Sequence, residues 1–439
     1  MEKVDVVIVG AGFLGLTAAY ELSRQGRTVR VVEMDKTPGG LAGTFSFDDG
    51  TTVEKFYHHW FNSDIDIKSL VAELGLNECV ITHPSSTGMY FNKRIWRLSS
   101  PLDLLRFNAL SLIDRIRLGI LVLRVRRIKH WKPIEHLTIR EWLVPLCGES
   151  AFKVVWEPLI NAKFSMYAEL VNAVWMWKKL VLRGSTRKKN GVEELSYFKG
   201  GFGRLAEEIV KEIRRNKGDV IFNCRVTGIR VSDKKIMTLL TEQGAIEGSQ
   251  YLFTPAFPII AKILRSSDNL NWINQLMRVK YLGNVCLILR LKCSLSDTYW
   301  LNVNDPGFPF VGVIEHTNLD VKENYKGTHI AYLSRYLTVD DPVWNYSDDE
   351  YFNFAFMHLK RMFPTLIRSW IVDYKVWRAE YAQPVTEPNY SEYVPGRDTP
   401  FLNAFVSTMA HIYPEDRGTN YAVREGRAIA SYISEKLSI

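Results

Sequence analysis

The sequence has few features of a disulfide-bonded, metal-binding or membrane-spanning protein. Its five cysteines are odd in number and form no CxxC pair, which argues against a disulfide framework and a structural zinc site. Reduced thiols favour a cytoplasmic setting. The longest early uncharged run, Val6–Tyr20, is shorter than a membrane span and contains three glycines. An apparent strand already begins at Val4, so we expect no signal peptide, and no metal site is predicted.

Several catalytic motifs are also missing. The chain shows no Ser-His-Asp set, no HExxH and no P-loop, which disfavours a serine hydrolase, a zinc protease and a P-loop nucleoside triphosphatase. Aromatic residues and hydrophobic residues are plentiful, at 12% and 46%, which excludes a disordered or low-complexity protein. A length of 439 residues predicts two or three compact units.

The first residues have the pattern of a dinucleotide-binding unit. Val4–Val9 is β-branched and nearly all apolar, as buried parallel strands are. The glycine-rich Gly10–Gly15 follows, then a helical pattern over Leu16–Gln25 and a second apolar strand over Thr28–Glu33. This order of strand, GxGxxG, helix, strand and acid predicts that the helix N-terminus faces a pyrophosphate.

Each residue of this pattern has an expected role. Gly10 permits the tight turn, Gly12 lets the backbone approach the phosphates, and Gly15 lets helix and strand pack closely. Glu33 has the spacing expected of an acid that binds ribose hydroxyls. The neighbouring residues that we expect at the cofactor are Phe13, Leu14 and Met34. A plain glycine-rich turn is the alternative.

A second glycine cluster indicates which dinucleotide is bound. It comprises Gly39, Gly40, Leu41, Ala42, Gly43 and Thr44. The cluster resembles the GG-x-x-x-[ST] element of the amine oxidase-like flavoproteins, which include protoporphyrinogen oxidase, phytoene desaturase and UDP-galactopyranose mutase. Small residues there let a second loop lie against the pyrophosphate and ribityl chain. The resemblance implies FAD as the cofactor.

The C-terminal region extends the resemblance. A short apolar strand over Leu402–Val406 precedes a helix from about Tyr421 to Lys436. In the family, the N-terminus of this helix points at the flavin pyrimidine, where its dipole stabilises negative charge. The matching residues here are Thr419, Asn420 and Tyr421. The sequence departs from the family at Thr408–Met409, where a glycine and an acid usually stand, so that cofactor contact must differ.

The middle of the chain contains a third cofactor-like segment. Gly200–Leu205 opens a helix to about Lys217, and a strand pair over Asp219–Phe222 and Arg225–Val231 follows. By resemblance to the family, the backbone at Val226 contacts the adenine. An ordinary α/β unit would show the same pattern.

These segments predict an α/β fold with interleaved domains. A Rossmann-like FAD-binding domain takes residues 1–80, 195–260 and 395–439. Between them lie a helical, basic substrate lobe over 81–194 and a strand-rich substrate domain over 261–394. We expect the active site where the α+β substrate domain meets the cofactor domain.

Two histidines are the candidate catalytic residues. His58 and His59 follow the second glycine loop in an aromatic segment, and a similar His-containing segment lies against the flavin in UDP-galactopyranose mutases and some desaturases. One of them could therefore protonate a substrate. The alternative is a pair of packed histidines, since neither has an identifiable base partner in the sequence.

Other residues are weaker candidates in the two insertions. Lys163 could face an anionic substrate, although helix packing is the simpler interpretation. Trp175 and Trp177 point to different sides of a helix, so one should be core and the other could line a cavity. Arg335 and Arg378 lie near the ends of strand-like runs and could bind phosphate, or could be ordinary surface residues.

The net charge of +8 is unevenly distributed. Leu102–Lys132 holds eight basic and two acidic residues among many apolar ones, and Lys178–Lys189 holds six basic residues and no acid. Each segment therefore carries +6, and the rest of the chain carries −4. A basic, apolar helical stretch suits an anionic membrane surface, whereas a solvated basic face is the alternative. No motif supports nucleic-acid binding.

The combined prediction is an FAD-dependent oxidoreductase that removes a hydride from a C–H or C–N centre. Its substrate would be small or lipophilic, such as a polyprenyl-linked sugar, and the protein would be cytoplasmic or peripheral on the inner face of the membrane. The alternative is a non-redox flavoenzyme that isomerises a sugar, as in UDP-galactopyranose mutase. A third hypothesis is a flavin-stabilised membrane scaffold without activity. The sequence does not predict the oligomeric state.

Overall fold

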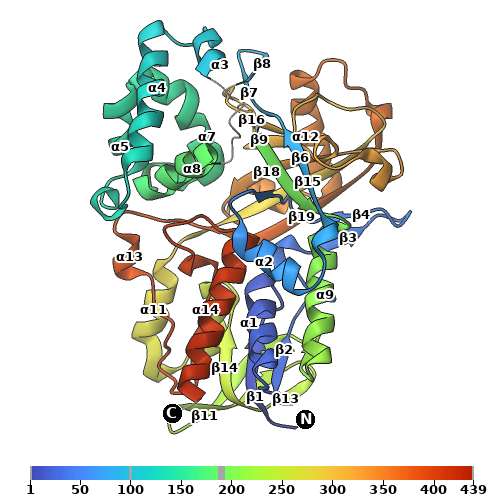
Figure 1. Cartoon of the computed structure of the whole chain (residues 1–439), viewed down its shortest axis with the longest axis vertical. Coiled ribbons are helices and arrows are strands. Elements are labelled where there is room, and N and C mark those ends of the chain that lie inside the picture. The colour runs from blue at the N-terminus through green and yellow to red at the C-terminus, as the bar shows by residue number, and fades with distance from the viewer. Residues whose placement is uncertain (1, 98–100, 186–192, 438–439) are drawn as a thin grey trace.

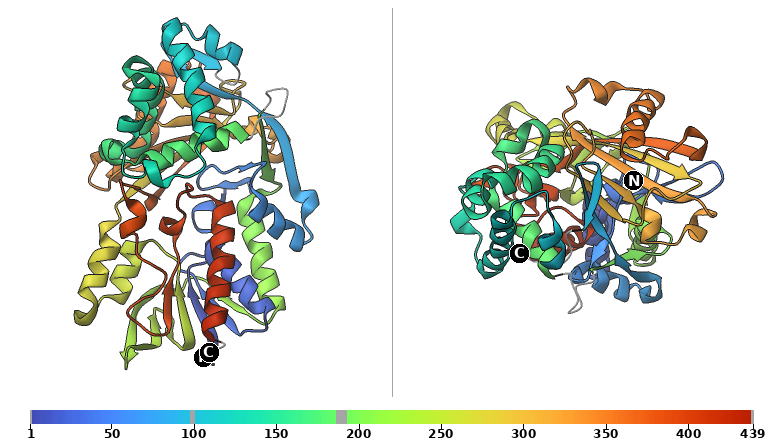
Figure 2. Two further views of the ribbon diagram at one scale, coloured as in Figure 1. Left: turned by 60° about the vertical axis from the view of Figure 1, so that its left-hand side comes forward. Right: turned by 90° about the horizontal axis from the view of Figure 1, so that it is seen from above.

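The computed structural model describes residues 2–97, 101–185 and 193–437. A parallel five-stranded sheet forms one end of the molecule, and both termini lie at its far edge (Figures 1 and 2). Its strands, in spatial order, are β10 (Asp219–Ile221), β2 (Val29–Val32), β1 (Val4–Val9), β14 (Gly248–Phe253) and β20 (Ala404–Val406). The expected mixed α/β fold is confirmed.

Strand β1 is apolar throughout because both faces of this sheet are covered. Val6 and Ile8 pack into a core with the helices α1 (Phe13–Arg24), α9 (Gly201–Arg215) and α14 (Thr419–Leu437). Val7 and Val9 pack on the other side with the helices α10 (Phe257–Leu264) and α11 (Leu270–Arg278) and with a small antiparallel sheet. That sheet consists of β11 (Val226–Ser232), β12 (Lys235–Thr241) and β13 (Gly244–Ile246).

One strand pairing predicted from the sequence is wrong. Asp219–Phe222 and Arg225–Val231 do not pair with each other, because β10 joins β2 in the parallel sheet and β11 pairs with β12. The chain leaves one sheet and enters another within five residues. The local pattern of apolar residues identifies both strands. It does not identify the strands they pair with, because pairing is decided by the tertiary structure.

A seven-stranded sheet forms the opposite end of the molecule. Its order is β19 (Ile371–Pro384), β15 (Tyr281–Leu291), β18 (His329–Leu337), β17 (Gly312–Glu315), β16 (Trp300–Val303), β7 (Thr87–Phe91) and β8 (Arg94–Arg97). The helix α12 (Asp348–Met362) packs on it. Two short sheets lie between the ends: β3 (Thr44–Ser46) with β4 (Thr52–Glu54), and β5 (Trp60–Phe61) with β9 (Glu193–Phe198) and β6 (Val80–Ser85).

The segment 81–194, expected to be mostly helical, therefore begins with strands. β7 and β8 extend the sheet of the second insertion, because β7 pairs in parallel with β16. The helices follow as α3 (Pro101–Arg106), α4 (Leu112–Arg127), α5 (Ile139–Cys147), α6 (Glu149–Ala151), a π-helical turn (Phe152–Trp156), α7 (Glu157–Phe164) and α8 (Ala173–Ser185). This helical lobe has its own hydrophobic core and stands beside the seven-stranded sheet (Figure 1).

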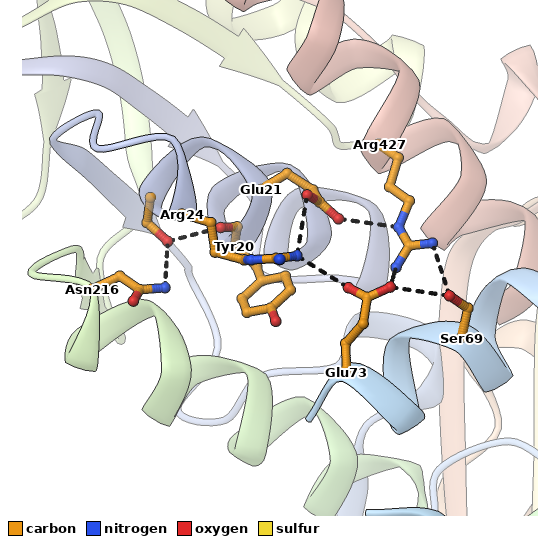
Figure 3. A network of polar contacts seen from close by, with 8 residues as sticks. Tyr20, Glu21, Arg24, Ser69, Glu73, Asn216 and Arg427 are labelled. Carbon is orange, nitrogen blue, oxygen red and sulfur yellow. Dashed lines mark hydrogen bonds and ion pairs between the residues drawn. The ribbon is translucent and has the colours of Figure 1, made fainter. Parts of the chain in front are cut away.

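A polar network ties three helices together on the cofactor side (Figure 3). Arg427 of α14 bonds Glu21 of α1 at 3.1 Å and Glu73 of α2 (Ile65–Glu73) at 2.5 Å. Arg24 of α1 also reaches Glu73, at 3.2 Å. Because α1 and α14 both begin near the cavity described below, this network helps to hold their N-terminal ends in register.

Across the described ranges, no helix has both the length and the apolar composition needed to cross a bilayer.

Candidate active site

The first glycine loop forms a tight connection between β1 and α1. Gly10 has φ +103°, in the left-handed region that favours glycine. A Cβ on Gly15 would lie 2.1 Å from the Gly10 carbonyl oxygen, so no larger residue fits there. A Cβ on Gly12 would meet nothing within 4 Å, and no side chain caps α1. The space over the helix N-terminus is therefore open, as a phosphate site requires.

The second glycine loop lies directly against the first. The Gly39 N–H donates to the Ala11 carbonyl oxygen at 2.8 Å, and a Cβ on Gly40 would lie 3.4 Å from the Gly12 Cα. Gly39 has φ +110° and leads into the short turn Gly40–Ala42, followed by Gly43 and Thr44. Two glycine loops thus face one open space.

Glu33 lies at the end of β2 and shapes the first loop. Its carboxylate accepts hydrogen bonds from the Ala11 N–H at 2.6 Å and the Asp35 N–H at 2.9 Å. Burial raises the pKa of this carboxyl group. Val226 packs in the same core as Val32, whereas Met34 is exposed. The sugar and adenine contacts assigned to these residues stay predictions.

The N-terminus of α14 reaches the same space. The Thr419 hydroxyl accepts a hydrogen bond from Trp60 Nε1 at 2.9 Å, and Asn420 Oδ1 accepts one from the Ile67 N–H at 3.1 Å. Both side chains therefore hold neighbouring elements in place. A cofactor contact at Thr419, Asn420 or Tyr421 is expected to involve the backbone N–H groups of the helix end.

A cavity of about 320 Å³ connects these elements to the substrate side. Its walls come from the aromatic segment after β4, from α7 and α8, from strands of the seven-stranded sheet and from the start of α14. Leu41, His58, His59, Thr419, Asn420 and Tyr421 all line it. The structure thus brings the two candidate histidines together with one glycine loop and the C-terminal helix.

The histidines are held by different contacts. His58 Nδ1 lies 2.6 Å from the Phe56 carbonyl oxygen, and its ring packs against Phe202. Burial lowers the pKa of His58 to about 4. The positive charge of Arg417 lowers this pKa further, whereas the Phe56 carbonyl raises it. His58 is therefore neutral at pH 7. His59 Nδ1 lies 3.0 Å from the Tyr299 hydroxyl.

A charged cluster in the cavity wall was missed by sequence reasoning, apart from Lys163. Arg417 Nη2 donates to the Tyr336 hydroxyl at 2.7 Å, and Lys163 Nζ lies 4.0 Å from the centre of the Tyr336 ring. Lys179 pairs with Asp416 at 2.7 Å. These five residues come from α7, α8, β18 and the loop before α14. A charged run before a predicted helix, residues 415–417, was the only local signal.

The cluster changes the acidity of its members. Burial opposes ionisation of Tyr336, but the positive charges of Arg417 and Lys163 lower its pKa to about 8. Burial also disfavours the charged form of Asp416, yet Lys179, Lys163 and Arg417 hold its pKa well below the usual range. Burial lowers the pKa of Lys163.

Four buried polar atoms of the cavity wall have no hydrogen-bond partner in the described part of the chain: Arg417 Nε, Trp156 Nε1, Trp175 Nε1 and Asn284 Oδ1. Such atoms are uncommon in folded proteins and are expected to meet a ligand or water. Together with the open glycine loops they fit a protein that holds a large polar cofactor and a substrate.

The weaker sequence candidates have different outcomes. Trp177 is core and Trp175 lines the cavity, as expected. Arg335 and Arg378 pair with Asp341 at 2.9 Å and Asp348 at 3.0 Å and do not line the cavity, and phosphate binding by them stays a prediction. Of the second basic segment, Arg187, Lys188 and Lys189 lie outside the described residues.

Sequence comparison identifies the family. The model of the flavin containing amine oxidoreductases matches residues 15–434. The chain belongs to this family. It is therefore an enzyme whose cofactor is FAD, and the residues described above fit that cofactor. Among curated proteins, it is 22% identical to the 15-cis-phytoene desaturase of an Oncidium hybrid cultivar over 92% of this chain and 73% of that protein.

Solved structures share the fold. A candidate protoporphyrinogen oxidase from Exiguobacterium sp. 255-15 superposes with a TM-score of 0.78 and 15% identity, over 99% of this chain and all of that one. A reduced UDP-galactopyranose mutase superposes with a TM-score of 0.70 and 16% identity, over 90% of this chain and 85% of that one. At these identities the likeness concerns the fold alone.

Proposed function

We propose that this oxidoreductase removes a hydride from a C–H or C–N centre of a lipophilic substrate bound in the cavity. The observation that carries the proposal is a mostly apolar cavity lined by Leu41 of the second glycine loop and by the N-terminus of α14, with the first glycine loop lying against the second. FAD, when bound, supplies the hydride acceptor. The protein supplies binding, orientation and electrostatics.

The apolar wall of the cavity has two tasks in this proposal. Leu159, Ile160, Met176 and Leu180 from α7 and α8 face Trp300 from β16 across the lining. Such a wall excludes water from the reacting carbon and holds an alkyl or isoprenoid chain by burial, at roughly 25 cal/mol per Å² of apolar surface. Tyr57 stays a neutral phenol here, since burial raises its pKa.

The histidines have a limited role at neutral pH. His58 is neutral and its Nδ1 is engaged with the Phe56 carbonyl, so it serves as a shape-determining neighbour rather than a proton donor. His59, which faces the cavity and contacts Tyr299, is the better candidate for a proton transfer.

The test is anaerobic reduction of the purified holoenzyme. Candidate isoprenoid alcohols, lipid-linked sugars and amines are mixed with it, and the flavin absorbance is followed. Bleaching by a lipophilic substrate is the expected result. Purified protein without a flavin spectrum would contradict the proposal, and a bound flavin that neither substrate nor dithionite reduces would favour the scaffold hypothesis.

The alternative is a sugar isomerase that needs reduced flavin but performs no net oxidation. The likeness to UDP-galactopyranose mutase and the cationic cavity wall favour testing it. Dithionite-reduced enzyme is supplied with nucleotide sugars and the products are separated. Isomerisation without net redox change would replace the oxidase proposal.

We further propose that the surface of α3 and α4 contacts an anionic membrane. The buried residues of α4 form one narrow stripe, Asp114, Leu118, Leu121 and Val125. Large apolar side chains are exposed on both helices: Leu102, Leu105, Leu112, Ile113, Ile116, Ile120, Val122 and Leu123. Exposed arginines lie among them at positions 106, 117, 124, 126 and 127. Apolar and basic side chains together match an anionic lipid surface.

This surface is connected to the cavity through the lobe. α4 and α8 share the lobe's hydrophobic core, and α8 supplies part of the cavity wall. The proposed membrane surface and part of the cavity wall therefore belong to the same packed lobe.

Vesicle co-sedimentation tests this second proposal. We expect binding to phosphatidylglycerol-containing vesicles, and a drop of about tenfold or more when Ile113, Ile116 and Leu123 become Gln. The matched control replaces Met357, Ile367 and Val372, also exposed apolar residues, by Gln. Equal sedimentation of both variants would contradict membrane contact at α4.

A further inference from the structure

The cavity holds more positive charge than its acids balance. Lys179 and Asp416 form a close pair at 2.7 Å. Lys163 and Arg417 meet instead at Tyr336, at 4.0 Å from the ring centre and 2.7 Å from the hydroxyl. Within residues 2–97, 101–185 and 193–437, neither cation has a carboxylate within 4 Å.

Lys163 and Arg417 share the negative charge of Asp416 with Lys179, so both cations stay costly to bury beside an apolar wall. The lowered pKa of Lys163 reflects that cost, whereas a guanidinium keeps its charge in any protein environment. A negative group entering the cavity would pair with both cations and recover the lost solvation. The cluster therefore predicts that the ligand carries a negative charge.

Three of the four unsatisfied hydrogen-bonding atoms of the cavity wall point the same way, and the fourth, Asn284 Oδ1, is an acceptor. Arg417 Nε, Trp156 Nε1 and Trp175 Nε1 are all donors without acceptors in the described chain. The ammonium of Lys163 and the phenol of Tyr336 add further donors. An oxyanion offers several acceptor lone pairs, whereas an ammonium group offers none.

The lining is mostly apolar, so an inorganic anion would leave most of the cavity without a partner. We propose that Lys163, Tyr336 and Arg417 form the subsite for an oxyanion group, carboxylate or phosphate, of an amphiphilic substrate. This inference rests on the proposed function, since it names the substrate class of the same site. It disfavours cationic amines and plain hydrocarbons as substrates.

The first experiment titrates the holoenzyme with four ligands of similar size: benzoate, phenyl phosphate, benzylamine and benzyl alcohol. Affinity is measured from flavin difference spectra and by calorimetry. We expect at least one of the two anions to bind ten times more tightly than benzylamine or benzyl alcohol. The better anion identifies the carboxylate or the phosphate as the natural group.

The second experiment compares lysine variants in the helical lobe. Lys163→Met should weaken anion binding about tenfold to a hundredfold at unchanged flavin content, and Lys163→Arg should recover part of it. The matched control is Lys153→Met, because Lys153 is exposed and pairs with Glu149 on the lobe surface. It should bind anions like the unmodified enzyme.

Three results would overturn the inference. The first is benzylamine binding as tightly as the anions, and the second is Lys163→Met binding the anions unchanged. The third is a Lys163→Met protein that loses FAD or shifts its flavin potential while anion affinity stays the same, which would assign the cluster to the cofactor. Anion binding needs no turnover, so its failure is distinguishable from failure of the proposed reaction, which is read from flavin reduction.

Discussion

The two sides of the cavity are built in different ways. On the cofactor side, two glycine loops within residues 10–44 lie against each other, and Leu41 of the second loop reaches the cavity wall. On the substrate side, long side chains from four separate elements converge, and their charges create the chemistry. The cofactor side requires residues without a side chain, whereas the substrate side requires particular charged side chains.

This difference predicts how each side responds to substitution. A Cβ added at Gly15 meets backbone that cannot move, so the fold itself should suffer. Removal of a cation such as Lys163, which forms no close ion pair in the described chain, should leave the fold largely intact because it also removes a buried charge. The following variants test that contrast.

The largest effect is expected at Gly15. Gly15→Val would place a Cβ 2.1 Å from the Gly10 carbonyl oxygen, so α1 must move away from β1. We expect a loss of more than about 4 kcal/mol and no FAD-loaded protein, measured by thermal unfolding and flavin absorbance. Gly12→Ala is the control: with nothing within 4 Å of its Cβ, it should fold and lose only FAD affinity. A stable, flavin-loaded Gly15→Val protein would refute this view of the loop.

The next effect is expected at Glu33. Glu33→Ala removes the acceptor of the Ala11 and Asp35 N–H groups, which should cost about 1–3 kcal/mol and weaken FAD binding. Chemical denaturation and FAD titration measure both quantities. Glu33→Gln keeps one acceptor oxygen, so its stability and its FAD affinity should lie between those of the unmodified protein and of Glu33→Ala. Unchanged FAD affinity in Glu33→Ala would show that the carboxylate serves the protein loop alone.

A pH effect should separate the substrate side from the cofactor side. Tyr336 faces Arg417, Lys163, Asp416 and Tyr57, and its pKa is lowered to about 8. As pH rises through 8, phenolate forms and neutralises the cations, so benzoate affinity should fall several-fold while FAD stays bound. Burial also lowers the pKa of Lys163, and its deprotonation acts in the same direction. Tyr336→Phe should therefore remove the fall in benzoate affinity near pH 8. If Tyr336→Phe shows the same pH profile as the unmodified enzyme, Tyr336 is not the titrating group.

The smallest effect is expected in the network of Figure 3. Arg427→Gln removes ion pairs to Glu21 and Glu73 at a partly exposed site, so we expect a loss of about 0.5–1 kcal/mol. Arg427→Lys should lose less. Thermal unfolding at low and high salt checks both, because salt should reduce the difference. A loss of several kcal/mol would mean that the network is needed for the α1–α14 contact.

The glycine side was largely predictable from the sequence because its parts are consecutive. Strand β1, the glycines and Glu33 follow one another, and each residue type has a backbone reason to be there. The partners of β10 and β11 were not predictable, since strand pairing depends on distant segments. The sequence also could not predict that Ile113 and Ile116 are exposed, because an apolar helix face can pack inward or meet a membrane.

The sequence by itself determined the family, the cofactor and the glycine loops expected to hold it, because these depend on local backbone chemistry. Only the tertiary structure decided which cations line the cavity. Lys163 and Arg417 are 254 positions apart and meet at Tyr336, whereas Arg335 is that tyrosine's neighbour in the chain and points to Asp341. Adjacent residues of a strand face opposite sides of a sheet, so proximity in the chain cannot assign a charge to a cavity.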